Sequence, residues 1–344
     1  MAVLKLLIIQ FRQLGDILLT TPVLSAIMAE NPNSVVDIVT YPMGRLILTG
    51  NPEVHRHWVA PQTGLLASVA FVFEIRRQRY DVVLDFMGTP RSALLARLIN
   101  AGRRIAFASK RSGFFSDVVP RGAAPDYIVR EKFQLLVPLG IRPGSEHLTL
   151  PWTSGDAEVA KKFLGDNPAI NLSRRRVMLS PTHRRTERKW PKASWVELAN
   201  WLVTEQKAAV VWVWGPGEEA EIDELNQLTA QLGTKTPKAS FKELAALVAS
   251  SDLFIANSNG PSHIAVAVNT PSIQIHGPTS AVCWCPLSAR HRGLQGETMA
   301  GISVSEVKRV VSNMWPLVDA GADGLRNHGL ITSEREALVV RPDL

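Results

Sequence analysis

The chain has 344 residues, enough for two domains of ordinary size. It is 46% hydrophobic and 20% charged, which is a globular composition and argues against a disordered chain. Its formal net charge of +7 predicts an anionic partner, such as a phosphorylated small molecule, a membrane surface or nucleic acid. Its two cysteines, Cys283 and Cys285, provide no disulfide framework, and their C-x-C spacing indicates two half-buried thiols more than a metal site.

The sequence shows no pattern of a secretory signal or of a membrane span. The apolar run at 6–9 is interrupted by Gln10 and Arg12, too early for the apolar region of a signal peptide. No stretch approaches the ~18 uninterrupted apolar residues of a membrane-spanning helix. We therefore expect a soluble, cytoplasmic protein, with contact to a membrane surface as a further option.

The first half of the chain alternates strand and helix patterns. Apolar runs predict the strands, and apolar residues at helical spacing predict the helices. In chain order these are a strand at 4–9, a helix at 17–30, a strand at 35–40, a helix at 44–48, a strand at 81–85, a helix at 92–99 and a strand at 104–107. Pro22 lies inside the first helix, so either its early turns tolerate the proline or Thr21 caps a new helix with Pro22 in its first position.

The texture changes at 142–174, which reads as a linker with a short helix at 156–164. Beyond it the expected strands are 176–179, 210–214, 253–256 and 272–276, and the expected helices are 194–204, 218–231, 241–250, 261–267 and 304–314. This rhythm predicts an α/β protein with two doubly wound, Rossmann-like domains whose strand ends face each other across a cleft. We place these domains at 1–168 and 169–318, followed by a polar tail without clear periodicity at 319–344.

The first candidate site is the turn RQLGD at 12–16, between the first strand and the first helix. Ligands of α/β proteins bind at the carboxyl ends of strands, and this turn lacks the G-x-G-x-x-G of dinucleotide-binding proteins. Gly15 permits a tight turn. Asp16, at a helix N-terminus, can accept a proton from a hydroxyl. Helix capping by Asp16 is the alternative, and the spacing alone slightly favours it.

A strongly basic segment surrounds the strand at 176–179. Between 174 and 192 there are eight lysines and arginines and one acid, a net charge of +7. The cations are Arg174, Arg175, Arg176, Arg184, Arg185, Arg188, Lys189 and Lys192. Cations at the end of a strand favour a diphosphate ligand, whereas a solvated basic loop is the usual explanation of such a run.

Three further turns follow predicted strands. After the Gly-Pro-Gly turn at 215–217, Glu218 and Glu219 begin a helix, where acids serve equally well as partners of the helix dipole or as ligands of a ribose diol. The turns NSNGPSH at 257–263 and HGPTS at 276–280 supply glycines, hydroxyls and helix N-terminal amides, which together form an anion cradle. Considered alone, His263 is better explained as a core histidine.

Together these motifs resemble glycosyltransferase family 9, whose best-known members are the ADP-heptose:lipopolysaccharide heptosyltransferases. The resemblance covers about residues 4–314 and rests on F-R-x-L-G-D-I-L-L-T-T-P, K-W-P, G-P-G-E, S-N-G-P-S-H-I-A and H-G-P-T in that order. It implies the GT-B fold, with an acceptor-binding N-terminal domain and a sugar-nucleotide-binding C-terminal domain. It further implies inversion at the anomeric centre, with no metal and no cofactor required.

The resemblance implies a role for each matched residue. Asp16 matches the general base. Arg188 or Lys189 matches the cation that meets the diphosphate, and Glu218 or Glu219 matches the acid that binds the ribose. Ser258 stands where the family's D-x-G-x-x-H turn usually has aspartate. The expected substrate- and nucleotide-binding positions are Arg12, Gly15, Thr182, Glu218, Glu219, Ser258, Asn259, Gly260, His263, Gly277 and Thr279.

The expected reaction is transfer of a heptose from ADP-heptose to a lipopolysaccharide inner-core acceptor. Arg12 beside the motif resembles the branch that adds a later core heptose. The partners are then a nucleotide sugar and an anionic glycolipid, with peripheral contact to the cytoplasmic face of the inner membrane. Basic segments at 76–79 and 103–111 are candidates for holding the acidic groups of the lipid, although a solvated helix face is preferred for 76–79.

Other functions are also considered. Nucleic acid is not expected, because the nine tryptophans do not interleave with arginines as a base-stacking platform would require. The alternatives are a family 9 transferase that uses another nucleotide sugar or acceptor, and a non-catalytic nucleotide-binding relative.

Overall fold

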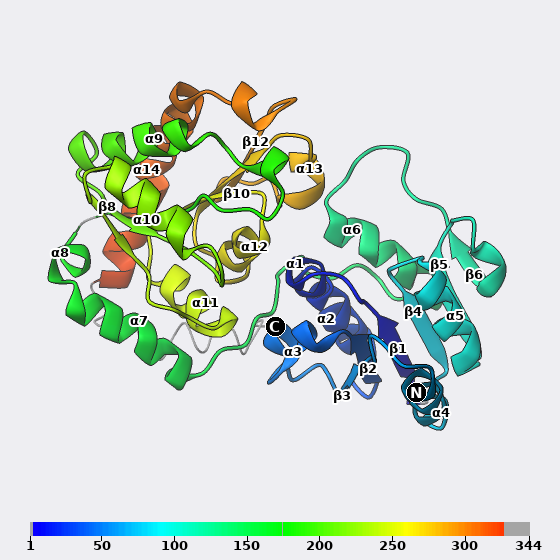
Figure 1. The fold of residues 1–344 in the computed structure, drawn as a ribbon. Helices are drawn as coiled ribbons and strands as arrows, with labels where there is room; N and C mark the ends of the chain where they lie inside the picture. Colours follow the sequence, from blue (N-terminus) through cyan, green and yellow to red (C-terminus); the bar gives the residue numbers. More distant parts are fainter. Residues whose placement is uncertain (1–2, 174, 327–344) are drawn as a thin grey trace. The chain divides into compact units, whose positions relative to one another are not determined.

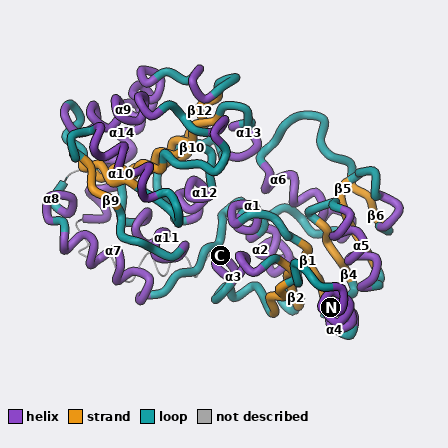
Figure 2. Tube along the Cα trace, viewed as in Figure 1, coloured by secondary structure: helices purple, strands orange, loops and turns teal. Residues whose placement is uncertain are grey.

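The computed structural model describes residues 3–173 and 175–326, and the chain divides into two compact units, Met1–Pro151 and Trp152–Leu344 (Figure 1). Each unit contains one six-stranded sheet in which every pair of neighbouring strands is parallel. Figure 2 shows helices flanking the strands of both units. Parallel strands require crossover connections, and the crossover helices cover the faces of the sheet. The predicted α/β class with two doubly wound domains is thereby confirmed.

The sheet of the first unit has the strand order β3-β2-β1-β4-β5-β6. Its strands are β1 (Lys5–Ile9), β2 (Val35–Thr40), β3 (Arg56–Val59), β4 (Val82–Asp85), β5 (Arg103–Phe107) and β6 (Asp117–Val119). Its helices are α1 (Leu14–Leu18), α2 (Thr21–Glu30), α3 (Arg45–Leu48), α4 (Leu65–Arg76), α5 (Pro90–Ile99) and α6 (Ile128–Phe133), with short 3-10 helices η1 (Pro42–Gly44), η2 (Ser112–Phe114) and η3 (Gln134–Leu139). From β1 the chain adds strands outward to one side as far as β3, and then returns to add β4, β5 and β6 on the other side. The carboxyl ends of β1 and β4 therefore form the switch point where α/β proteins bind ligands.

Both faces of this sheet are covered by apolar side chains. Leu7 of β1 belongs to a buried cluster with Ile75 of α4 and Leu95 of α5. Its neighbour Leu6, which points to the opposite face because strand side chains alternate, is also fully buried. The continuous apolar run at the start of the chain is therefore explained by burial on both sides.

The sheet of the second unit has the strand order β12-β11-β10-β7-β8-β9. Its strands are β7 (Arg176–Ser180), β8 (Ala209–Trp212), β9 (Gly233–Lys235), β10 (Leu253–Asn257), β11 (Ser272–His276) and β12 (His291–Gln295). Its helices are α7 (Ser154–Asp166), α8 (Pro168–Asn171), α9 (Lys192–Thr204), α10 (Glu219–Leu228), α11 (Phe241–Ala249), α12 (Gly260–Ala267), α13 (Ala281–Trp284) and α14 (Val304–Arg326), with 3-10 helices η4 (Thr186–Arg188) and η5 (Met299–Gly301). The switch point here lies between β7 and β10.

The structure corrects several expectations about single elements. The helix expected at 17–30 is divided into α1 and α2, so a new helix begins near Pro22, as the second alternative proposed. Its N-cap is Thr20 rather than Thr21, and Pro22 lies in its first turn. The helix expected at 304–314 continues through Pro316 to Arg326. The expected polar tail at 319–344 therefore begins within α14, while 327–344 lie outside the described residues, as does Arg174 of the basic segment.

Other elements had no counterpart in the expectation. In the first unit β3, α4, β6 and α6 were not predicted, nor were α8, β9, α13 and β12 in the second. Contacts divide the chain at Pro151, whereas the sequence pattern placed the division at 168. The difference arises because α7, which was interpreted as part of the linker, packs against α11 of the second unit. No helix in the described part of the chain is both long and apolar enough to cross a membrane.

Candidate functional site

The carboxylate of Asp16 lies in the first turn of α1, directly beyond β1 at the switch point of the first sheet. Its side chain is half-buried, whereas Gly15 beside it is buried. The N-cap of α1 is Gln13, and no side chain caps this helix. Capping by Asp16, the alternative suggested by the sequence, is therefore not what holds the aspartate here.

A lysine that the sequence analysis did not single out lies against this turn. Lys132, from α6, donates through Nζ to the main-chain oxygen of Asp16 at 2.8 Å and to the hydroxyl of Thr20. Thr20 donates to the same oxygen, also at 2.8 Å. Because Lys132 shares a helical face with the buried Val129 and Phe133, its spacing was the one available signal of a buried cation.

The amino group of Lys132 is buried, and keeping its charged form away from water costs free energy. Burial lowers the pKa of Lys132 to about 7; the negative charge of Asp16 opposes this shift and the positive charge of Arg12 adds to it. Arg12 itself is exposed. Its charge also helps to lower the pKa of Arg121, for which burial is the larger cause. The β1–α1 turn thus holds one half-buried carboxylate among positive charges.

Asp85, at the end of β4, is a second carboxylate at the same switch point. It lies opposite Ile9 in the sheet and is buried. Its Oδ1 accepts from the main-chain N–H groups of Met87 at 2.8 Å and Gly88 at 3.3 Å, while its Oδ2 has no hydrogen-bond partner among the described residues. Burial raises the pKa of Asp85. From sequence, Asp85 was interpreted only as the end of a strand.

In the second unit, the K-W-P motif follows β7, and its tryptophan is an anchor. Trp190 is buried, its main-chain N–H donates to the side chain of Asn257 at 3.1 Å, and its indole N–H donates to the carbonyl of Ile302 at 2.9 Å. Its ring meets that of Trp195 edge to face at 5.1 Å. The two cations that precede Trp190 therefore project from a fixed segment.

Those two cations point to different surroundings. Lys189 donates to a carboxylate oxygen of Glu221 in α10 at 2.6 Å. Arg188 is half-buried and forms no ion pair with any carboxylate in the part of the chain that the structure describes. Burial lowers the pKa of His276, at the end of β11, to about 3, and the charges of His263 and Arg188 add to this effect. The positive charge of Arg188 therefore acts on the carboxyl end of the sheet.

The basic segment at 174–192 is not one patch. Arg175 and Arg176 lie at the amino end of β7, where Arg175 pairs with Asp319 at 2.8 Å and Arg176 with Asp252 at 3.5 Å. Only the cations after β7 lie at the carboxyl end. The large local charge seen in the sequence is thus divided between the amino and the carboxyl ends of the strands.

The two glutamates after β8 also differ. Glu218 accepts through Oε2 from the hydroxyl of Thr182 at 2.7 Å and from the main-chain N–H of Gly215 at 2.8 Å. Glu219 is exposed and lies 3.3 Å from the ammonium of Lys235 in β9. Glu218 and Thr182 are therefore brought together at the strand ends, while Glu219 interacts with the edge of the sheet.

The turn after β10 is held by its asparagines. Asn259 caps α12 by accepting from the N–H of Ser262 at 3.2 Å, and it donates to the hydroxyl of Ser180 at 3.0 Å and to the carbonyl of Thr182 at 3.1 Å. These bonds tie the end of β10 to the end of β7 at the switch point. Ser258 precedes Asn259, and its main-chain N–H donates to the carbonyl of Ile275. Asn259 thus has a structural role in this turn.

The glycines at the ends of β10 and β11 have different surroundings. A Cβ at Gly277 would lie 2.6 Å from the main-chain nitrogen of Met299, so a close approach of η5 requires glycine there. A Cβ at Gly260, the first residue of α12, would meet nothing within 4 Å. Thr279 lies 3.4 Å from Nδ1 of His276. The N–H of Ala281, which begins the four-residue α13, is bonded to the side chain of Gln295, so this turn offers fewer free amides than expected.

The expected site residues therefore fall into two groups. Arg12, Gly15 and Asp16 lie at the switch point of the first sheet. The turns that follow the neighbouring strands β8, β7, β10 and β11 carry Thr182, Arg188, Glu218, Ser258, Asn259, Gly260, His263, Gly277 and Thr279. Lys189 and Glu219 are engaged with other side chains of the second unit.

The cysteines lie in and just after α13. Cys283 is half-buried and Cys285 is buried, and both are free thiols. Burial raises the pKa of Cys285 to about 12, so its thiol stays protonated near neutral pH.

Comparison with protein families identifies the chain. The model of glycosyltransferase family 9 (heptosyltransferase) matches residues 69–311. The chain belongs to this family. It is therefore a glycosyltransferase. Among its family relatives, lipopolysaccharide heptosyltransferase 3 of Escherichia coli is 29% identical over 295 residues, which cover 80% of this chain and 84% of that relative.

Solved structures of the family have the same fold. A family 9 glycosyltransferase from Veillonella parvula aligns with a TM-score of 0.77 at 17% identity, over 90% of this chain and 96% of that chain. The heptosyltransferase WaaC of Escherichia coli with ADP aligns with a TM-score of 0.72 at 21% identity, over 90% of this chain and 100% of that chain. The predicted GT-B fold is thereby confirmed.

Proposed function

We propose that this family 9 enzyme transfers a heptose from ADP-heptose to a sugar hydroxyl of a lipopolysaccharide inner-core acceptor, with Asp16 as general base. The carrying observation is the half-buried Asp16 carboxylate at the switch point of the first sheet, in a helix that it does not cap. A carboxylate so placed is available to accept the proton of the attacking hydroxyl. General-base assistance of this kind contributes roughly 10²–10⁴-fold to the rate.

The second unit supplies the groups for the donor. The leaving diphosphate gains negative charge as the glycosidic bond breaks, and a fixed cation lowers the energy of that charge. Arg188 is the better candidate for this role, because Lys189 is already paired with Glu221. Glu218, held by Thr182 and Gly215, is the better candidate for the ribose diol, because Glu219 is exposed and paired with Lys235.

The sugar and the acceptor are proposed from the relatives. Several are lipopolysaccharide heptosyltransferases, and the protein named lipopolysaccharide heptosyltransferase 3 is 29% identical to this chain. The exposed positive charge of Arg12 beside Asp16 suits an acceptor that carries acidic groups. The chemistry needs no resident metal in this scheme, because the guanidinium of Arg188 takes the place of a metal cation at the diphosphate.

The test is release of ADP from ADP-heptose in the presence of a truncated lipopolysaccharide core. We expect release by the wild type, and a loss of about 10²–10⁴-fold in Asp16→Asn with an unchanged melting temperature. Asp166→Asn, which removes an exposed charge from α7, is the matched control and keeps full turnover. A folded Asp16→Asn variant with normal turnover would overturn the assignment of the base.

The identity of the donor is tested separately. Binding of ADP without turnover of ADP-heptose would retain the nucleotide site and reject the sugar, and Ser258, which lies directly after β10, is then the first residue to examine. Failure to bind ADP at all would reject the proposed donor side.

A further inference from the structure

Helix α4 has an unusual surface for a helix of a globular protein. Its sequence, LLASVAFVFEIR, is apolar around most of its circumference, yet only Ile75 among its residues is fully buried. Leu65 is 80% exposed, Leu66 is 86% exposed and Phe73 is 62% exposed. Large apolar side chains gathered in this way mark a surface for binding a partner or a ligand.

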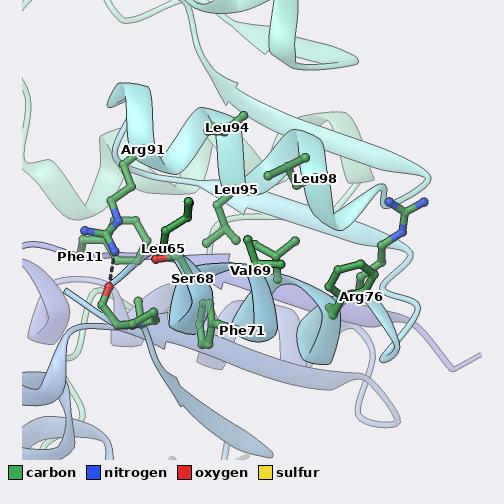
Figure 3. A pocket seen from close by; sticks show the side chains of 14 residues that line it. Phe11, Leu65, Ser68, Val69, Phe71, Arg76, Arg91, Leu94, Leu95 and Leu98 are labelled. Atoms are coloured by element: carbon green, nitrogen blue, oxygen red, sulfur yellow. Dashed lines mark hydrogen bonds between the residues drawn. The ribbon is translucent and has the colours of Figure 1, made fainter. Parts of the chain in front are cut away.

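An apolar groove runs between α4 and α5, with a cavity of about 370 Å³. Figure 3 shows Leu94, Leu95 and Leu98 of α5 along one wall, and Leu65 and Val69 of α4 along the other. Its only polar lining residues in the described chain are Ser68 and two arginines. The groove is therefore suited to an aliphatic chain rather than to a sugar.

Arginines mark both ends of the groove. In Figure 3 Arg91 lies at one end and Arg76 at the other. Arg77 and Arg79 follow α4, and they and Arg76 are exposed without an ion pair to any acid within the described residues. The two helices also carry Arg97, against a single acid, Glu74. An aliphatic floor with cationic ends complements a molecule that joins an acyl chain to an anionic headgroup.

One end of the groove reaches the candidate catalytic turn. Phe11, which lines the groove, precedes Arg12 and belongs to the same β1–α1 turn as Asp16. Its ring stacks on Tyr41 at 4.9 Å, and the guanidinium of Arg91 lies over the Tyr41 ring at 5.6 Å. The apolar groove is therefore continuous with the turn that carries the proposed base.

We propose that the α4–α5 groove is a membrane-docking surface, which lies on an anionic phospholipid bilayer and takes an acyl chain between the two helices. The role of this docking rests on the proposed function, since a glycolipid acceptor would lie in the same bilayer. Leu65, Leu66, Val69 and Phe73 enter the acyl boundary, and Arg76, Arg77 and Arg79 contact the phosphates. From sequence, the segment at 76–79 was interpreted as a solvated basic face in preference to a lipid contact. The apolar residues of α4 that precede it, which were not predicted to form a helix, favour the lipid contact instead.

The test is flotation of the full chain with vesicles of phosphatidylcholine, alone and with phosphatidylglycerol added, at low and high salt. We expect binding to the anionic vesicles that weakens with salt. The double variant Leu66→Glu/Phe73→Glu should bind at least about tenfold more weakly, since a charge replaces each apolar side chain that enters the acyl boundary. Leu172→Glu places the same charge at a side chain that is 84% exposed in the second unit, and should bind as the wild type does.

The outcomes separate this proposal from the proposed enzymatic function. Transfer to a deacylated, water-soluble acceptor should be equal in the wild type and in Leu66→Glu/Phe73→Glu, because neither residue belongs to the catalytic turn. Vesicle binding without any transfer would reject the enzymatic proposal and retain the docking surface. Absence of vesicle binding at low salt, or equal binding by the double variant, would overturn the docking surface. A dimer abolished by the double variant, without vesicle binding, would assign the face to a second copy and overturn it as well.

Discussion

The ammonium of Lys132 donates a 2.8 Å hydrogen bond to the main-chain oxygen of Asp16, although 116 residues separate the two in the chain. The same ammonium also bonds to Thr20, so α6 connects α1 to the start of α2. A hydrogen bond within a protein contributes about 0.5–1.5 kcal/mol to stability. Lys132 therefore fixes the backbone on which the proposed base is mounted.

The burial of Lys132 predicts a pH-dependent stability. Its pKa falls from 10.5 to about 7 on folding, so between these values the unfolded chain holds a proton that the folded chain does not. The free energy of unfolding therefore rises with pH across this window. From about pH 6 to about pH 9, thermal unfolding should show the wild type gaining about 3 kcal/mol relative to Lys132→Met.

The control for this prediction is Lys110→Met, since Lys110 is exposed. Its stability should follow that of the wild type at every pH. Parallel stability curves for Lys132→Met and the wild type would contradict the shifted pKa of Lys132.

A second prediction separates the neighbouring cations Arg188 and Lys189. Lys189 is paired with Glu221, whereas Arg188 has no acidic partner within the described chain. Arg188→Ala should weaken ADP binding by about 10–100-fold, because a hydrogen bond to a charged group is lost. Lys189→Ala removes a surface ion pair worth about 0–1 kcal/mol and should leave ADP affinity nearly unchanged. Isothermal titration calorimetry measures both, and the reverse pattern would assign the diphosphate to Lys189.

A third prediction concerns two glycines that the sequence placed in the nucleotide site. Gly277→Ala should lower the free energy of unfolding by about 1–3 kcal/mol, because its Cβ would meet the main-chain nitrogen of Met299 at 2.6 Å. Gly260→Ala has open space around its Cβ and should keep the wild-type melting temperature while weakening ADP binding. Thermal unfolding and ADP titration of the pair decide this. A stable Gly277→Ala with poor ADP binding would mean that the ligand, rather than packing, requires that glycine.

Local patterns in the sequence determined much of the fold. The strand at 35–40 and the strand at 272–276 were predicted with the observed bounds, since each carries isoleucine or valine between turn residues. The order of the motifs along the chain likewise identified the family, and the turns that carry them lie at strand ends because β-α alternation dictates it.

Other features were determined only by the tertiary structure. Helix α4 was missed because residues 65–76 are apolar around most of the helix and show no clear helical period. The basic segment at 174–192 was treated as one patch, because the sequence shows charge along the chain but not the end of the strands at which each cation lies.

The partners of the proposed site residues also came from the tertiary structure alone. Lys189 pairs with Glu221, Glu218 accepts a hydrogen bond from Thr182, and Lys132 donates to Asp16 only because separate elements pack together. Periodicity reports whether a side chain is buried, and motifs report which chemistry is available. Which group meets which is set by contacts between segments far apart in the chain, and these depend on how helices cross the sheet.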